Sequence, residues 1–318
     1  MSKWYAVILV LVLCSPGCSK KTEWPDSSEL DQSPSIPADG IGQVTADREP
    51  EVETGFRGDV HPALKGKQLL ELRAVCSPVG TGMGFEKEFF PSQFRPLFDA
   101  FSIAEALHDY SSADFSIFLP QQIGEPGQLW KLDVGRVAPF LRQFHHGASM
   151  NLEAPGRKSG PNGGYAVLRA VSETHLEIVA RVHAEFGLAA GMYLTPAYFE
   201  CRLLIDRRIG QVTDFALSVP TDVSLNTTLT VVLPTEALID IIHVDKMELS
   251  GGDAKAGDEY AWTDQVSMEQ ARKKLKRAFY KFMEIQWVKP ELAIAEAKQQ
   301  NRPILAIVLW GDLDDQSC

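Results

Sequence analysis

A succession of short strand-like segments between residues 165 and 249 constrains the fold of this chain more than any other feature. The segments partly alternate apolar and polar side chains, and Gly210, Pro220 and Pro234 interrupt the series. They cover residues 176–183, 199–206, 214–219, 225–232 and 238–244. Because short strands with turns every ~10 residues are typical of antiparallel sheets, we expect a largely antiparallel β body.

The region before this body combines strands and a helix. Residues 68–76 and 115–119 predict strands, and residues 137–144 predict a short helix. Pro139 argues that this helix starts late, because proline removes a backbone donor from a helix interior. The predicted fold class is therefore α+β. Five phenylalanines recur near helical spacing and predict core packing rather than a ligand pocket: Phe89, Phe90, Phe94, Phe98 and Phe101.

The region after the β body predicts two helices. Ser267 and Gln270 form a capping box, S-x-x-Q, that opens a helix to about Phe282. Its basic side carries Arg272, Lys273, Lys274, Lys276 and Arg277. This side is open to two interpretations, a solvated helix face or a contact with an anionic surface. Pro290 suits the first turn of a second helix, and Asn301 suits its left-handed end.

The last segment predicts a buried strand followed by an acidic loop. Residues 303–310 form a continuous apolar run rich in branched side chains, as in strands buried on both faces. The loop contains Asp312 and two further aspartates, and the sequence stops at Cys318. A helix, a buried strand and a loop that delivers a cysteine make up the first half of a thioredoxin-like domain. In such a domain, the N-terminus of the helix that follows the cysteine lowers the pKa of the thiol. This helix is absent from the sequence, so we expect the chain to be cut short.

Composition and charge limit the classes of partner. The chain has 45% hydrophobic and 23% charged residues, which is typical of a soluble globular protein. Its formal net charge of −11 argues against nucleic acid as a partner. Residues 19–58 contain nine acidic and four basic residues with few large apolar side chains, so we expect a disordered linker. The predicted domains are a signal segment (1–18), the acidic linker (19–58), a β-rich domain (59–265) and a truncated thioredoxin-like segment (266–318).

The N-terminus has the pattern of an export signal. Lys3 precedes an apolar core over residues 4–13, which is shorter than the about 20 residues that a membrane-spanning helix needs. Gly17 before Cys18 fits a bacterial lipoprotein cleavage site with Cys18 as the lipidated first residue. A plain signal peptide and an uncleaved anchor are the alternatives. We predict an exported, membrane-anchored protein of the bacterial periplasm or cell envelope.

The histidines do not predict a metal site. His145 and His146 are adjacent, so their side chains point apart, and no cysteine or carboxylate lies beside them at ligand spacing. His175 and His183 would share one face of an unbroken strand, where a core or exposed pair is commoner than a ligand pair. Asn226 opens a glycosylation sequon that matters only in a eukaryotic secretory pathway.

The cysteines leave one candidate for redox chemistry. Cys14 and Cys18 belong to the signal segment. Cys76 and Cys201 lie in apolar strand-like contexts, where a disulfide and buried free thiols are both open. Cys318 has no partner left, and an odd cysteine in an exported protein is either reactive or completed by a group outside the chain.

The end of the chain resembles the selenoprotein N family. The residues Leu-Trp-Gly-Asp-Leu-Asp-Asp-Gln-Ser-Cys at 309–318 are similar to the segment that precedes the redox centre of that family. Five further segments fall in the family's order, the last three less specifically: 271–282, 293–301, 224–226, 234–236 and 246–249. The resemblance covers roughly residues 56–318.

The resemblance implies a redox role for Cys318. In the family, selenocysteine and glycine follow this cysteine, and this chain lacks both. A selenocysteine codon, UGA, read as a stop would end the chain here, while a natural terminus and a lost tail are the alternatives. The implied catalytic residue is Cys318, and the implied supporting residues are Ser317, Gln316, Asp315, Asp314 and Trp310.

The function implied by the resemblance is thiol/selenol oxidoreduction at a membrane surface, with oxidised cysteines of partner proteins as substrates. The selenol would attack and Cys318 would resolve the intermediate, while Asp312, Asp314 and Asp315 raise the Cys318 pKa and keep its thiol protonated. Neighbouring Cα atoms lie about 3.8 Å apart, below the usual range of about 4.4–6.8 Å for a bridge, so the bridge is strained and readily reduced.

Three expectations complete this interpretation. The chain as it stands lacks the attacking atom, so we expect little redox turnover from it and no cofactor besides the missing selenocysteine. Animal members of the family carry a calcium-binding EF-hand, but no segment here matches its pattern, so we expect no calcium site. The alternative function is a non-enzymatic binding or scaffold domain of an envelope lipoprotein.

Overall fold

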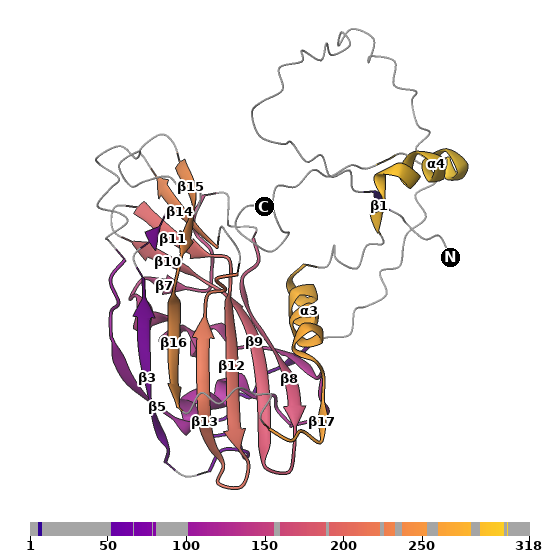
Figure 1. The fold of residues 1–318 in the computed structure, drawn as a ribbon. Helices are drawn as coiled ribbons and strands as arrows, with labels where there is room; N and C mark the ends of the chain where they lie inside the picture. The colour runs from indigo at the N-terminus through magenta and orange to yellow at the C-terminus, as the bar shows by residue number, and fades with distance from the viewer. Residues whose placement is uncertain are drawn as a thin grey trace.

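The computed structural model describes the β body and the helices that follow it. The described residues are 6–7, 52–65, 67–77, 79–80, 101–155, 160–188, 191–222, 226–232, 237–252, 260–280, 287–301 and 304. Within them, a mostly antiparallel two-sheet body carries a few helices (Figure 1). The predicted α+β class and the largely antiparallel arrangement are confirmed.

The larger sheet has ten strands and supplies the long strands in the foreground of Figure 1. Its order is β2-β6-β8-β9-β12-β13-β16-β3-β5, with β17 paired to β8. Neighbouring strands are antiparallel except for β2 and β6, which pair in parallel. The strands are β2 (Glu53–Thr54), β3 (Leu69–Cys76), β5 (Leu107–Ser111), β6 (Leu129–Lys131), β8 (Gly163–Val171), β9 (His175–His183), β12 (Phe199–Asp206), β13 (Gln211–Ser218), β16 (Met247–Gly252) and β17 (Asp264–Gln265).

The smaller sheet has six strands in the order β4-β15-β14-β11-β10-β7. The chain passes between the two sheets from β9 to β10, from β11 to β12 and from β15 to β16, so both sheets share one core. The strands are β4 (Val79–Gly80), β7 (Ala148–Ser149), β10 (Glu185–Leu188), β11 (Met192–Pro196), β14 (Thr227–Val232) and β15 (Ala237–Val244). A separate two-residue pair joins β1 (Ala6–Val7) to β18 (Trp287–Val288) in parallel.

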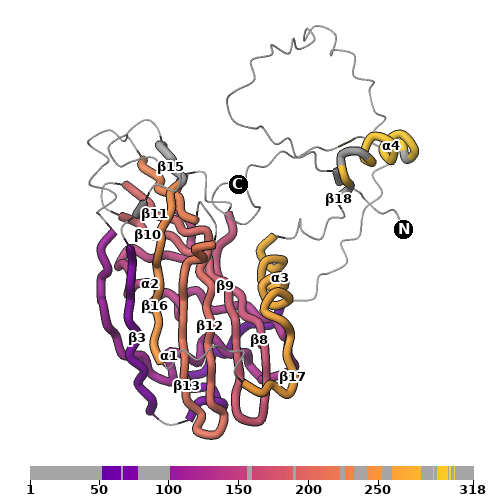
Figure 2. Tube along the Cα trace, viewed as in Figure 1, coloured from indigo at the N-terminus to yellow at the C-terminus, as the bar shows by residue number. Residues whose placement is uncertain are grey.

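An aromatic core lies on one face of the larger sheet, where α1 (Ser112–Phe115), the 3₁₀ helix η4 (Ser116–Phe118) and α2 (Val134–Phe144) cover it (Figure 2). The rings of Phe118 and Phe140 meet edge to face at 5.2 Å, and each lies 5.4 Å from the ring of Phe215 on β13. Burying a side chain of this size stabilises the fold by roughly 1.5–3 kcal/mol. We call this the inner face of the sheet.

The prediction of a strand over residues 115–119 is wrong. The side chain of Ser111 accepts a hydrogen bond from the Asp114 amide, and the Asp114 carboxylate accepts one from the Ser111 amide at 2.7 Å. This capping box opens α1 directly before the apolar run, and η4 continues the helical turn. The run is fully buried, and the local capping signal makes it helical.

The helix predicted over residues 137–144 exists but starts earlier. The Asp133 side chain accepts a hydrogen bond from the Arg136 amide at 3.2 Å and caps α2, which therefore begins at Val134. Pro139 lies inside the helix. Its apolar neighbours Phe140 and Leu141 are buried, so core packing outweighs the one backbone hydrogen bond that the proline removes.

The third helix, α3 (Met268–Phe279), covers the opposite, outer face of β8 and β9. Its Ala271 and Leu275 pack against Val167 and Val179, in a cluster separate from the main core. Side chains along a strand alternate between its two faces, so this second cluster fixes the side of the sheet on which α3 lies. Ser267 caps the helix as predicted, and the helix ends at Phe279 rather than near Phe282.

The fourth helix, α4 (Pro290–Gln300), has the predicted ends. Pro290 occupies its first turn, and Asn301 ends it in the left-handed conformation at φ 51° and ψ 53°. The strand predicted for residues 303–310 lies outside the described residues except for Ile304, so the thioredoxin-like segment stays a prediction. At the other end of the body, β2 lies within residues 19–58, so the sheet includes residues that we assigned to the linker.

Candidate functional site

The residues predicted for redox chemistry lie outside the described part of the chain. They are Cys318 with Trp310, Asp312, Asp314, Asp315, Gln316 and Ser317, and the same holds for the predicted lipidation residue, Cys18. Their roles therefore stay predictions.

Two cysteines are described, and neither has the environment of a reactive thiol. Cys76 on β3 and Cys201 on β12 are both free, which favours the free-thiol alternative over the disulfide; Cys201 is buried and Cys76 is partly buried. Burial raises the pKa of the Cys76 thiol to about 11. Burial, with a smaller contribution from the Glu200 carboxylate, raises the pKa of Cys201 well above its ordinary value. Both residues therefore remain protonated thiols at neutral pH.

The histidines singled out from the sequence have structural surroundings. His145 ends α2, and its Nδ1 accepts a hydrogen bond from the Gly147 amide at 3.0 Å. His175 lies 4.0 Å from the Asp206 carboxylate, whereas the His183 ring lies 4.4 Å from the ring of Phe279. Among the described residues, no three histidine, cysteine or acidic side chains converge as a metal site would require.

Asn226 of the sequon is a structural residue. It is fully buried. Its Nδ2 donates to the backbone oxygens of Pro220 and Val244 at 2.8 and 3.0 Å, and its Oδ1 accepts from the Val244 amide at 2.8 Å. The side chain thus satisfies backbone groups near the ends of two strands and is inaccessible to modification in the folded protein.

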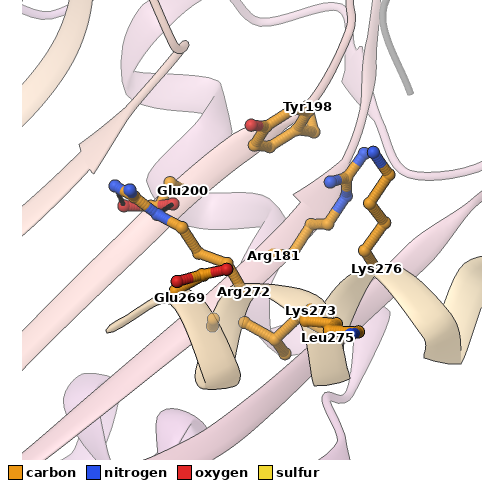
Figure 3. A pocket seen from close by; sticks show the side chains of 9 residues that line it. Arg181, Tyr198, Glu200, Glu269, Arg272, Lys273, Leu275 and Lys276 are labelled. Atoms are coloured by element: carbon orange, nitrogen blue, oxygen red, sulfur yellow. Dashed lines mark hydrogen bonds and ion pairs between the residues drawn. The ribbon is translucent and has the colours of Figure 1, made fainter. Parts of the chain in front are cut away.

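The candidate site in the described structure is a pocket of about 300 Å³ on the outer face of the larger sheet, between α3 and strands β9 and β12 (Figure 3). We call it the α3 pocket. Its lining residues are Ala180, Arg181, Tyr198, Glu200, Glu269, Arg272, Lys273, Leu275 and Lys276. Four of these side chains are cationic and two are acidic, an excess of two positive charges on a chain whose net charge is −11.

Strand alternation and helix periodicity build this pocket. Arg181 on β9 pairs in register with Glu200 on β12, so both side chains emerge on the outer face of the sheet. On α3, residues three or four apart lie on the same side of the helix, which aligns Glu269, Arg272, Lys273 and Lys276 along the pocket.

Arg181 is held in a fixed orientation. Its side chain is only 5% exposed, and its guanidinium lies 3.6 Å from the centre of the Tyr198 ring. Its Nε donates a hydrogen bond to Nε2 of His183 at 3.1 Å. Burial, followed by the adjacent Arg181 charge, lowers the His183 pKa well below 6.5, so the imidazole stays neutral and can accept this bond.

Arg272 and Glu200 close one end of the pocket. The guanidinium donates two hydrogen bonds to the carboxylate, at 2.7 and 2.6 Å, in a bidentate pair. The hydrogen bond with Glu200 is the main reason that the Arg272 pKa is raised. Besides this ion pair, the charged lining residues are Arg181, Lys273, Lys276 and Glu269.

A buried charge network lies beside the pocket on the same face of the sheet. The Glu177 carboxylate is fully buried and accepts hydrogen bonds from Arg169 and from Nε of Arg202, the latter at 2.5 Å. Gln265 of β17 accepts a further bond from Arg169 at 3.1 Å. Through Gln265, the network ties the central strands to the segment before α3. Removing one of its charged partners would leave an uncompensated buried charge.

Only part of the pocket could be predicted from the sequence. The basic side of α3 was visible, but Arg181, Tyr198 and Glu200 were not singled out. The missed signal was in β9, where His175, Glu177, Arg181 and His183 recur at odd positions on one face. Such a polar face on a strand buried on both sides indicates that another charged element covers it.

Comparisons with known proteins find similarity to selenoprotein N. Selenoprotein N of Homo sapiens is 25% identical over 66% of this chain, and selenoprotein N of Danio rerio is 27% identical over 83% of it. Selenoprotein N of Mus musculus is 24% identical over 66% of the chain. The chain is selenoprotein N-like. The predicted family resemblance is thereby confirmed over 66–83% of the chain.

The comparisons with selenoprotein N also have limits. The matches cover 44%, 52% and 47% of the human, zebrafish and mouse proteins, so the chain spans about half the length of the curated relatives it matches. No family model matches the chain, and no solved structure matches it. Within the described residues of this selenoprotein N-like chain, we find no helix with the length and apolar character to cross a bilayer.

Proposed function

We propose that the complete protein is a membrane-attached thiol/selenol oxidoreductase of the selenoprotein N type. The observation that carries the proposal is the similarity to selenoprotein N over 66–83% of the chain, together with a C-terminal motif that includes Cys318. The described cysteines support the choice of Cys318, because burial keeps Cys76 and Cys201 protonated.

The proposed reaction transfers two electrons to a disulfide of a partner protein. The selenolate next to Cys318 attacks one sulfur and releases the other as a thiol. The Cys318 thiolate then attacks selenium, which frees the second partner thiol and leaves a selenium–sulfur bridge between neighbouring residues. A dithiol reductant reduces this bridge and restores the pair. The strain of a bridge between neighbours makes the last step fast.

The test compares the 318-residue chain with a chain extended by selenocysteine and glycine after Cys318. The measurement is the dithiol-dependent reduction of a model protein disulfide. We expect turnover from the extended chain, little from the 318-residue chain, and none above background from the extended chain with Cys318→Ser. Equal activity of the 318-residue and extended chains would contradict the proposal.

The coding sequence supplies an independent test. If the codon after Cys318 is TGA and an open frame continues beyond it, the selenocysteine assignment is supported. A TAA or TAG codon at that position rules out the assignment, whatever the activity measurements give.

The α3 pocket favours a second candidate function, a non-enzymatic binding or scaffold role of the β body in the cell envelope. A preformed pocket lined by charged, aromatic and aliphatic side chains can bind a ligand without any redox step. If the extended chain shows no turnover but the β body still binds a ligand in this pocket, the binding role becomes the primary one.

A further inference from the structure

The last turn of α3 is held against the sheet by a cluster of five side chains that we call the α3 latch. The centre of the Phe279 ring lies 4.9 Å from that of Tyr165 on β8 and 4.4 Å from that of His183 on β9, both edge to face. The Tyr280 ring lies 6.1 Å from His183, and the Arg181 guanidinium lies 5.4 Å from its centre. The latch therefore fixes the point at which the chain leaves α3.

His183 is the central titratable group of the latch. It is only 3% exposed, and its Nε2 accepts the hydrogen bond from Nε of Arg181 at 3.1 Å. An imidazole nitrogen accepts a hydrogen bond only when it carries no proton. Burial, followed by the Arg181 charge, lowers the His183 pKa well below 6.5, and a hydrogen bond with the Ala197 backbone opposes these effects. The closed latch therefore contains a neutral imidazole.

The surroundings of His183 provide no counter-charge for a proton on its ring. Glu200 on β12 is held by Arg272 in the bidentate pair. Glu185, two residues along the chain, accepts hydrogen bonds from two backbone amides and a threonine hydroxyl. In the described part of the chain, no carboxylate forms an ion pair with His183. The other titratable or charged residues around it are Tyr165 and Arg181 on the sheet, Tyr198 before β12, and Lys276 and Tyr280 on α3 and at its end.

Protonation of His183 is incompatible with the closed latch. A protonated imidazole donates from both nitrogens, so its Nε2–H would face the Nε–H of Arg181, donor against donor. The two side chains would also carry like charges at 3.1 Å in a site shielded from water. A proton is therefore accommodated only when the imidazole is separated from Arg181 and hydrated.

The end of α3 is the element that can move. The strand β9 lies inside the sheet and pairs with β8 on one side and β12 on the other. The middle of α3 is attached through Ala271 and Leu275, whereas its last turn closes with the hydrogen bond from the Tyr280 amide to the Lys276 carbonyl at 3.0 Å. Helix ends open more easily than packed strands, so access to His183 comes from opening of this turn.

We propose that the α3 latch is a pH-sensitive device, in which neutral His183 holds the last turn of α3 on the sheet and protonation of His183 in mildly acidic solution releases it. Release loosens the attachment of the chain that continues to Cys318. The inference goes beyond the redox proposal, because the latch needs neither Cys318 nor selenocysteine. It can therefore fail while the redox proposal stands, and the reverse also holds.

The pH range of the latch follows from the two states of His183. In the open state the imidazole is hydrated and takes up a proton near the ordinary pKa of about 6.5, whereas in the closed state it stays neutral to a much lower pH. The closed state is therefore fully favoured above pH ~6.5, and opening increases as the pH falls below that value. Between pH 7.5 and pH 5.5 the ratio of open to closed molecules rises about tenfold.

Hydrogen exchange of the 318-residue chain tests the latch. Mass spectrometry measures the protection of the amides of residues 276–280 at pH 5.5 and pH 7.5, after correction for the pH dependence of intrinsic exchange. We expect the protection of this turn to be about tenfold lower at pH 5.5, and that of β9 and β12 to change less than about twofold. Equal protection of the turn at both pH values, or the same fall throughout the sheet, would overturn the inference.

Two histidine variants locate the proton. His183→Gln keeps an oxygen that can accept the hydrogen bond from Arg181 but does not titrate, so we expect the tenfold change to shrink to less than about twofold. His175→Gln, at the other end of the same strand, is the matched control and should keep the tenfold change. A tenfold change that persists in His183→Gln would place the proton elsewhere and refute the latch.

Phe279→Ala tests the latch without altering a titratable group, and it keeps the inference testable if His183→Gln does not fold. It removes the ring that covers His183. We expect low protection of residues 276–280 already at pH 7.5, a change below about twofold between the two pH values, and a His183 pKa, measured by NMR, that rises toward 6.5. Wild-type protection in Phe279→Ala would contradict the inference. Melting curves followed by circular dichroism establish that the three variants are folded.

Discussion

At the scale of single residues, burial decides which thiols can react. Burial raises the pKa of Cys76 to about 11, so at pH 8 only about one molecule in a thousand has a Cys76 thiolate. Cys201 is fully buried, and its pKa is raised well above the ordinary value. We expect iodoacetamide to label Cys318 at least about tenfold faster than either residue in the folded chain. Mass spectrometry of the alkylated peptides measures the three rates, and denaturation in urea should equalise them. Faster labelling of Cys76 would move the redox assignment away from Cys318.

Asp206 and Arg208 form a residue-scale contact that depends on pH. Arg208 donates to the Asp206 carboxylate at 2.5 and 3.1 Å, and this hydrogen bonding is the main cause that lowers the Asp206 pKa to about 2. The folded pKa lies below the unfolded value of about 3.9, so the pair stabilises the fold above pH ~4 and the contribution is lost as pH falls toward 2. We expect Arg208→Ala to lower the urea midpoint at pH 7, with a difference from wild type that shrinks between about pH 4 and pH 2. In Asp206→Asn, which already lacks the carboxylate, Arg208→Ala should have little further effect. The same difference at pH 7 and pH 2 would contradict the assignment.

At the scale of elements, Ala271 and Leu275 are the two buried side chains with which α3 packs on the sheet. Leu275 is 2% exposed and packs with Ala271 against Val167 and Val179. Leu275→Ala removes these contacts and leaves a cavity, so we expect it to destabilise the protein by about 2–4 kcal/mol. Arg277→Ala on the exposed side of the same helix serves as the control, with an expected change below about 0.5 kcal/mol. Urea unfolding at pH 7 measures both, and a cost below about 1 kcal/mol for Leu275→Ala would contradict the packing of α3.

Local signals and long-range packing explain which elements the sequence could predict. Alternation predicts the strands β9, β12 and β15. The Ser267 capping box predicts the start of α3, and Asn301 predicts the end of α4. All of these signals act within a few residues. The conformation of residues 115–119 was mispredicted because the apolar run was weighed without the capping box at Ser111. The α3 pocket could not be predicted, since it needs α3 to lie over β9 and β12, and these elements are far apart in the sequence. The polar face of β9 shows only that some charged partner covers it.

At the scale of the whole molecule, the proposed function requires the folded body to stay at a membrane. We propose that Cys18 carries the lipid and that the acidic stretch after it separates the body from the membrane surface. Burying an acyl chain contributes about 0.8 kcal/mol per methylene group to membrane binding, so the lipid holds the protein at the membrane. Expressed in a bacterial host, the wild-type chain should sediment with membranes, while Cys18→Ala should appear in the soluble periplasmic fraction. Cys14→Ala, a matched change within the same signal segment, should leave the chain on the membrane. If Cys18→Ala still sediments with membranes after salt and carbonate washing, the segment is an uncleaved anchor. If both variants are lost from the envelope, the segment is not an export signal.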